Sequence, residues 1–122
     1  MWYAAHIVTV FRYRNRRQRK FHVWENIIIV EAATSREAWE KADQLSQREH
    51  EFDDKSTRMN GIPTRLEFVG IRKVVECQGS IFARDDEIRS GTEITYNKFN
   101  VSSRADLDKF VAGEPVDVEY EE

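Results

Sequence analysis

Residues 2–33 read WYAAHIVTVFRYRNRRQRKFHVWENIIIVEAA, and this stretch decides the fold. Two apolar, aromatic and β-branched segments without helical periodicity, residues 2–13 and 21–33, flank a polar, basic segment. Such a pair is typical of two antiparallel strands joined by a turn. The sequence therefore predicts a long β-hairpin with a strongly basic tip.

Both faces of this predicted hairpin are apolar if Tyr13 faces Phe21. One face then carries Ala5, Ile7, Phe11, Val23, Ile27 and Ile29, and the other carries Ala4, Val8, Val10, Trp24, Ile28 and Val30. A sheet with two apolar faces has to be covered on both sides or to pair with another subunit. We therefore expect a homodimer, with candidate self-association residues Trp2, Val8, Val10, Trp24 and Ile28.

Helix signals follow the hairpin at once. Thr34 and Glu37 have the spacing of a capping box, in which each side chain satisfies a free backbone N–H of the first turn. The predicted helix buries a stripe formed by Ala38, Trp39, Ala42 and Leu45. A second helix is expected after Ser102 or Ser103, closed by Gly113 and Pro115.

Three further strands complete the predicted fold, at residues 66–77, 92–101 and 116–120. The expected fold class is α+β: one domain, residues 1–122, with a mostly antiparallel sheet of about five strands in the order ββαββαβ. Both helices are expected on one face of the sheet. Without its first strand this order is βαββαβ, so a ferredoxin-like topology is one candidate.

Charge is distributed unevenly along the chain, which has a formal net charge of −3. The first 24 residues hold six Arg and Lys and no Asp or Glu, whereas the last nine residues are acidic.

A single cysteine, Cys77, excludes an internal disulfide and favours a reducing compartment. The longest aliphatic run, residues 27–30, is too short for a membrane helix, and the start lacks the features of a signal peptide. We expect a cytoplasmic protein without a membrane partner.

The basic hairpin tip is the strongest candidate for a binding site. Its cations, Arg14, Arg16, Arg17, Arg19 and Lys20, have the charge to contact phosphates, and the flanking Tyr13 and Phe21 are placed to stack on bases. Two other interpretations stay open. The tip is either a solvated turn that protects the hairpin edge, or a site for an acidic protein, including the acidic tail of another copy.

Catalytic and metal-binding residues are not indicated. His6, His22 and His50 lack the spacing of metal ligands, and alternation places His6, His22 and Trp24 on a common face. Cys77 falls on the apolar side of a predicted strand, where a free cysteine acts as a small hydrophobe. The acidic groups at residues 53–54 and 85–87 lack the pattern of a calcium loop. We expect no cofactor and no metal.

Four segments together resemble a bacterial family described as a domain of unknown function (domain of unknown function 4288). They are residues 2–5 (WYAA), 30–39 (VEAATSREAW), 68–75 (FVGIRKVV) and 91–96 (GTEITY). The resemblance spans most of the chain. It implies a small bacterial cytoplasmic protein and carries over no activity or ligand.

Three functions remain in order of preference. The first is a non-enzymatic binding or interaction protein that self-associates. The second is a nucleic-acid-binding protein that uses the basic tip. The third is an enzyme whose site would require a pocket where His6, Cys77 or carboxylates converge.

Overall fold

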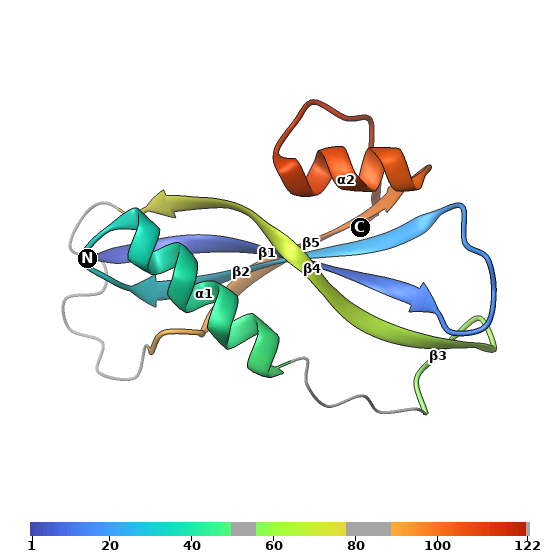
Figure 1. Ribbon diagram of the computed structural model, residues 1–122, viewed down its shortest axis with the longest axis horizontal. Helices are drawn as coiled ribbons and strands as arrows, with labels where there is room; N and C mark the ends of the chain where they lie inside the picture. Colours follow the sequence, from blue (N-terminus) through green and yellow to red (C-terminus); the bar gives the residue numbers. More distant parts are fainter. Residues whose placement is uncertain (50–55, 78–88, 122) are drawn as a thin grey trace.

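A computed structural model describes residues 1–49, 56–77 and 89–121. These described residues form two helices and one antiparallel sheet of six strands (Figure 1). The elements in chain order are β1 (Trp2–Tyr13), β2 (Phe21–Glu31), α1 (Ser35–Glu49), β3 (Arg58–Met59), β4 (Ile62–Glu76), β5 (Glu93–Val101), α2 (Arg104–Ala112) and β6 (Glu119–Glu121). The predicted α+β class is confirmed.

The sheet has the strand order β3-β4-β1-β2-β5-β6, and every ladder is antiparallel. The ferredoxin-like topology is not found, because β1 uses its two sides for β2 and β4 and leaves no place for a parallel neighbour. The short strand β3 is an addition to the predicted order. Only two of its residues pair, which is too short for a periodic signal.

The hairpin register differs by one residue from the expected one. Phe11 lies opposite His22, and Val10 lies opposite Val23, so the apolar sets of β2 exchange faces relative to β1. Because both faces are apolar, the alternation pattern by itself does not fix the register. His6 and His22 consequently lie on opposite faces, and His22 shares its face with Trp24.

The two helices cover opposite faces of the hairpin, not one face as predicted. Below α1 lies a cluster formed by Tyr3, Ala5, Ile7, Ile28, Val30, Ala32, Ala38, Ala42 and Ile71. Below α2 lies a cluster formed by Val8, Val10, Phe21, Val23, Phe99, Val101, Leu107 and Phe110. Side chains of a strand alternate between faces, so the hairpin is apolar on both sides because each side has its own helix.

Both helices begin as their sequences predict. The Thr34 hydroxyl accepts a hydrogen bond from the Glu37 N–H at 3.1 Å, and the Glu37 carboxylate accepts one from the Ala33 N–H at 3.4 Å. Ser103 caps α2 by accepting from the Asp106 N–H at 3.1 Å, and Gly113 ends it in the left-handed conformation. These contacts satisfy backbone groups that have no partner inside a helix.

Helix α2 approaches β4 at Gly70, where the register of β4 against β1 shifts. A Cβ atom at this position would lie 2.7 Å from Cγ1 of Val111, and the φ angle of Gly70 is +154°. Only glycine allows both the close approach and this backbone angle. The irregularity at Gly70 is therefore also the place where α2 meets the sheet.

Candidate functional site

The basic tip is the segment of residues 14–20 between β1 and β2, and it lies at the end of the hairpin away from the N-terminus (Figure 1). Arg16, Arg17, Arg19 and Lys20 are exposed, and Arg14 is half-buried. The five predicted cations are therefore brought together on one projecting turn. Exposed cations held close together attract phosphate groups.

Gln18 fixes the backbone of the basic tip from inside the turn. Its side-chain NH₂ donates to the carbonyl oxygens of Phe11 at 2.8 Å and Lys20 at 3.2 Å, and its Oε1 accepts from the Tyr13 N–H at 3.1 Å. The Arg14 N–H donates to the Pro63 carbonyl at 3.0 Å. These bonds join the two sides of the turn to each other and to β4.

Carboxylates of β6 already contact Lys20 at the end of the tip and His22 beside it. Lys20 Nζ lies 3.6 Å from Glu119 Oε2, and His22 Nδ1 lies 3.0 Å from Glu121 Oε2. The sequence raised the acidic tail of another copy as a partner for the tip. In the structure, the acidic tail of the same chain reaches its edge.

An aromatic surface, formed by Phe11, His22, Trp24, Tyr96 and Lys98, adjoins the tip on the face that α1 only partly covers. The Phe11 ring lies 5.3 Å from that of His22 and 5.1 Å from that of Trp24, and Trp24 lies 6.2 Å from Tyr96. Lys98 Nζ lies 5.2 Å from the Trp24 ring centre. Tyr96 is 55% exposed. Several rings and a cation are thus arranged side by side on an open part of the sheet.

The aromatic residues expected to flank the tip are placed differently. Phe21 is only 3% exposed in the cluster under α2, so it is not available for stacking. Tyr13 is half-buried. Trp24 and Tyr96 take the place expected for these rings. The sequence signal for the aromatic surface is that His22 and Trp24, and likewise Tyr96 and Lys98, are two residues apart and so share a face. Only the correct hairpin register shows which face that is.

A cavity of about 250 Å³ lies between the aromatic surface and α1. Its apolar walls come from Ile7, Trp24, Ile28, Leu45 and Leu66. Its polar groups belong to Asn26, Ser46, Glu49 and Glu93. Asn26 Nδ2 donates to Glu93 Oε1 at 2.6 Å. The cavity combines an apolar interior with oxygen acceptors.

The predicted self-association residues are largely internal. Val8 and Val10 are fully buried under α2, and Ile28 is buried under α1. Trp2 and Trp24 are half-buried. The prediction is wrong for the three aliphatic residues, because two helices of the same chain occupy the place assigned to a second subunit.

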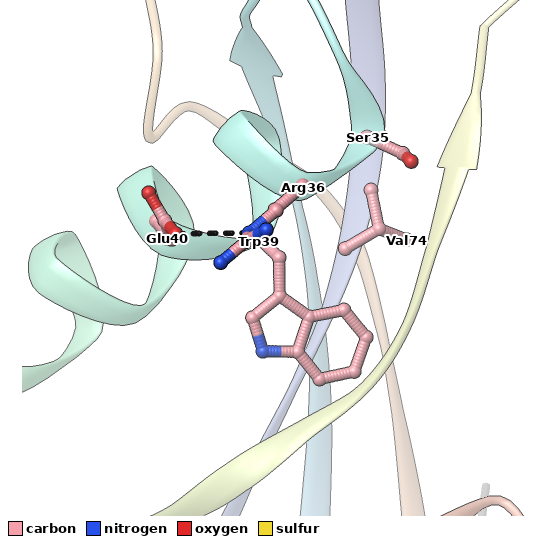
Figure 2. A pocket seen from close by; sticks show the side chains of 5 residues that line it. All are labelled: Ser35, Arg36, Trp39, Glu40 and Val74. Atoms are coloured by element: carbon pink, nitrogen blue, oxygen red, sulfur yellow. Dashed lines mark ion pairs between the residues drawn. The ribbon is translucent and has the colours of Figure 1, made fainter.

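An exposed tryptophan lies elsewhere, on α1. Trp39, expected in the buried stripe, is 42% exposed. The buried residues of α1 are Ala38, Ala42 and Ser46. Figure 2 shows the Trp39 indole extending from α1 alongside β4, in a pocket of about 490 Å³ that Val74, Ser35, Arg36 and Glu40 also line. Arg36 and Glu40 form an ion pair of 3.5 Å on the same helix.

A buried carboxylate, Glu25, occupies the face opposite the aromatic surface. Its oxygens lie 3.5 Å from His6 Nδ1 and 3.2 Å from Arg72 NH1, and accept from Asn97 Nδ2 at 3.1 Å. Burial by itself would raise the pKa of Glu25, but the contacts with His6 and Asn97 and the charge of Arg72 outweigh it and lower the pKa to about 2. His6 and a carboxylate therefore converge, which the sequence did not indicate.

The remaining candidates for chemistry do not join this group. Burial raises the pKa of the half-buried Cys77 thiol, which disfavours the reactive thiolate. Within residues 1–49, 56–77 and 89–121, no three His, Cys, Asp or Glu side chains gather as a metal site. His50 and the acidic groups at 53–54 and 85–87 lie outside the described residues. Neither helix in the part of the chain that the structure describes is long and apolar enough to cross a membrane.

Comparison with known proteins gives one match. The family model described as Domain of unknown function (DUF4288) matches residues 2–94, a range that includes the hairpin, α1, β4 and the start of β5. Neither the curated proteins nor the solved structures contain a match to the chain. Because the matched residues make up more than half of its length, the chain belongs to the DUF4288 family.

Proposed function

We propose that this protein is a non-enzymatic binding protein for single-stranded nucleic acid. The observation that carries the proposal is the position of the basic tip next to the aromatic surface, at one end of the sheet. Cations that follow a phosphate backbone, combined with rings on which bases stack, are the two parts of a single-strand-binding site. The single Cys77 and the family resemblance support a place in the bacterial cytoplasm.

The open sheet face favours single strands over duplexes. Phe11, Trp24 and Tyr96 offer ring surfaces that only unpaired bases can reach, because paired bases are stacked on each other. Stacking contributes about 1–3 kcal/mol per base. The net charge of −3 works against binding elsewhere on the molecule, so a strand is confined to this end.

Fluorescence anisotropy with a labelled 20-nucleotide dT strand, in a series of salt concentrations, tests the proposal. Each phosphate contact contributes about −0.7 to the slope of log K against log salt. R16A/R17A/R19A should weaken binding and make the slope shallower by about 2 if each Arg contacts one phosphate. The control R36A/R104A/K109A removes the same charge from exposed positions on the helices and should bind more tightly than the tip variant.

A second variant separates nucleic acid from an acidic protein as the ligand. W24A/Y96A removes stacking and retains every cation of the tip, so dT binding should weaken while polyglutamate binding stays the same. Equal binding of dT by this variant and the natural chain would exclude the aromatic surface from the site. Absence of dT binding by the natural chain at low salt would refute the proposed function.

A second candidate function is self-association through α1, and the exposure of Trp39 favours it. Large exposed aromatic residues are enriched in protein interfaces. Arg36 precedes Trp39 by three residues and Glu40 follows it by one, and both line the pocket beside its indole, so a two-fold axis near Trp39 would bring Arg36 of each copy near Glu40 of the other. The occupant of this surface is therefore a second copy of the chain.

Sedimentation velocity at micromolar concentrations tests this candidate. The natural chain should sediment as a dimer and W39A as a monomer. Y96A, which changes an exposed ring on the aromatic surface, is the matched control and should remain dimeric. A monomeric natural chain would exclude self-association.

A further inference from the structure

The cavity beside the aromatic surface has a division of chemistry that points to a particular ligand. Ile7, Ile28, Leu45 and Leu66 form apolar walls, and Trp24 belongs both to the cavity and to the aromatic surface. Glu93 and Glu49 add carboxylates, which accept hydrogen bonds and donate none when ionised. The cavity therefore suits a flat, apolar ring that carries N–H donors on its edge.

Glu93 is held in place for such a contact. Asn26 donates to its Oε1 at 2.6 Å, and both residues line the cavity. Asn26 lies opposite Tyr96 in the pairing of β2 with β5, so the donor that fixes Glu93 belongs to the same part of the sheet as the aromatic surface. A carboxylate fixed in this way has fewer orientations to lose when it binds a ligand.

We propose that this cavity takes the guanine base of a bound single strand and that Glu93 reads its Watson–Crick edge. This inference rests on the proposed function. Guanine presents a ring N–H and an amino group side by side, two donors that match the two oxygens of one carboxylate. Adenine and cytosine present a donor beside an acceptor, and thymine presents one donor between two acceptors. Guanine alone offers the paired donors that an acceptor-only group selects.

The position of the cavity is compatible with phosphates on the basic tip. Trp24, at the edge of the cavity on β2, lies four residues from Lys20, a separation of about 13 Å at roughly 3.3 Å per strand residue. The carboxylates of Glu49 and Glu93 repel phosphates, so the backbone of the strand is directed towards the tip while one base enters the cavity. A short strand is long enough to reach both.

Anisotropy with labelled ten-nucleotide strands tests the inference. The strands are dT10 and dT10 with one central dG, dA or dC. The dG strand should bind about tenfold more tightly than dT10, and the dA and dC strands should lie closer to dT10. E93Q replaces one acceptor by a donor, so the ratio of the affinity for the dG strand to the affinity for dT10 should fall to about one. E114Q makes the same charge change at an exposed residue after α2 and should retain the preference.

The outcomes separate this inference from the proposed function. If dT10 binds and dG gives no preference, the guanine site is overturned and the proposed function stands. A dG preference that survives in a folded E93Q protein also overturns the assignment of Glu93. If no strand binds at low salt, the proposed function fails, and the guanine site fails with it. Should E93Q not fold, the natural chain still tests the guanine site: a preference for the dG strand over dT10 supports it, and equal binding overturns it.

Discussion

Next to the basic tip, one face of the β1–β2 hairpin is closed by a helix and the other is open. On the closed face, Val10 and Val23 are fully buried beneath α2. On the open face, Phe11 and Trp24 remain half-exposed, and neither belongs to the cluster beneath α1. The closed face buries aliphatic and phenyl side chains, whereas the open face presents rings beside a histidine and a lysine. The two faces of the hairpin are thus similarly hydrophobic, but one packs against a helix and the other is left as an accessible surface.

The largest expected effect is on the stability of the closed face. Phe110 is 3% exposed and packs against Phe99 at 5.2 Å between ring centres, so F110A should lower the free energy of unfolding by about 3–5 kcal/mol. Y96A on the open face should lower it by less than about 1 kcal/mol. Urea denaturation of both variants measures the difference. Equal losses would mean that both faces are equally part of the core.

Lowering the pH should destabilise the fold through Glu25, which lies on the same face of the hairpin as the cluster beneath α2. The pKa of Glu25 is about 2 in the folded chain against 4.5 ordinarily, so its contribution is complete above about pH 4.5 and is lost as the pH falls towards 2. The expected loss is roughly 3 kcal/mol. E25Q should be less stable at neutral pH and should lack this part of the pH dependence. Urea denaturation between pH 7 and 2 measures both chains, and parallel curves would contradict the assignment because all other carboxylates are common to them.

The smallest effect is expected on the open face and concerns binding. Glu119 contacts Lys20 and Glu121 contacts His22, so E119Q/E121Q should free both side chains, remove two negative charges beside the tip and tighten dT binding about three- to tenfold at low salt. E114Q/D117N changes the same charge in the segment that precedes β6. Anisotropy compares the two variants. Equal tightening by both variants would mean that β6 affects binding only through the net charge of the protein.

Local signals in the sequence predicted the parts of the fold that depend on local chemistry. The capping box at Thr34, the cap at Ser103 and the end of α2 at Gly113 are all confirmed, because each depends on one side chain or on its absence. The α+β class also followed from the order of strand and helix patterns.

The position of the helices and the composition of the open face could not be predicted in the same way. Both depend on the hairpin register, and a hairpin with two apolar faces tolerates a one-residue shift without exposing a different kind of residue. Tyr13 and Phe21 were therefore expected beside the tip where Trp24 and Tyr96 lie. Trp39 was expected inside from the apolar stripe of the helix, but α1 places two small residues, Ala38 and Ala42, against the sheet and leaves its largest ring at the side.

Gln18 has a consequence for the thermodynamics of any anion that meets the basic tip. Its three hydrogen bonds already hold the backbone of the turn, so the conformational entropy of that backbone is lost when the protein folds and not when a ligand arrives. Only the side chains of Arg16, Arg17 and Arg19 remain to be ordered. A single uncharged glutamine thereby makes the surrounding cations a preorganised array, and Q18A should slow or weaken capture of a polyanion without removing any charge.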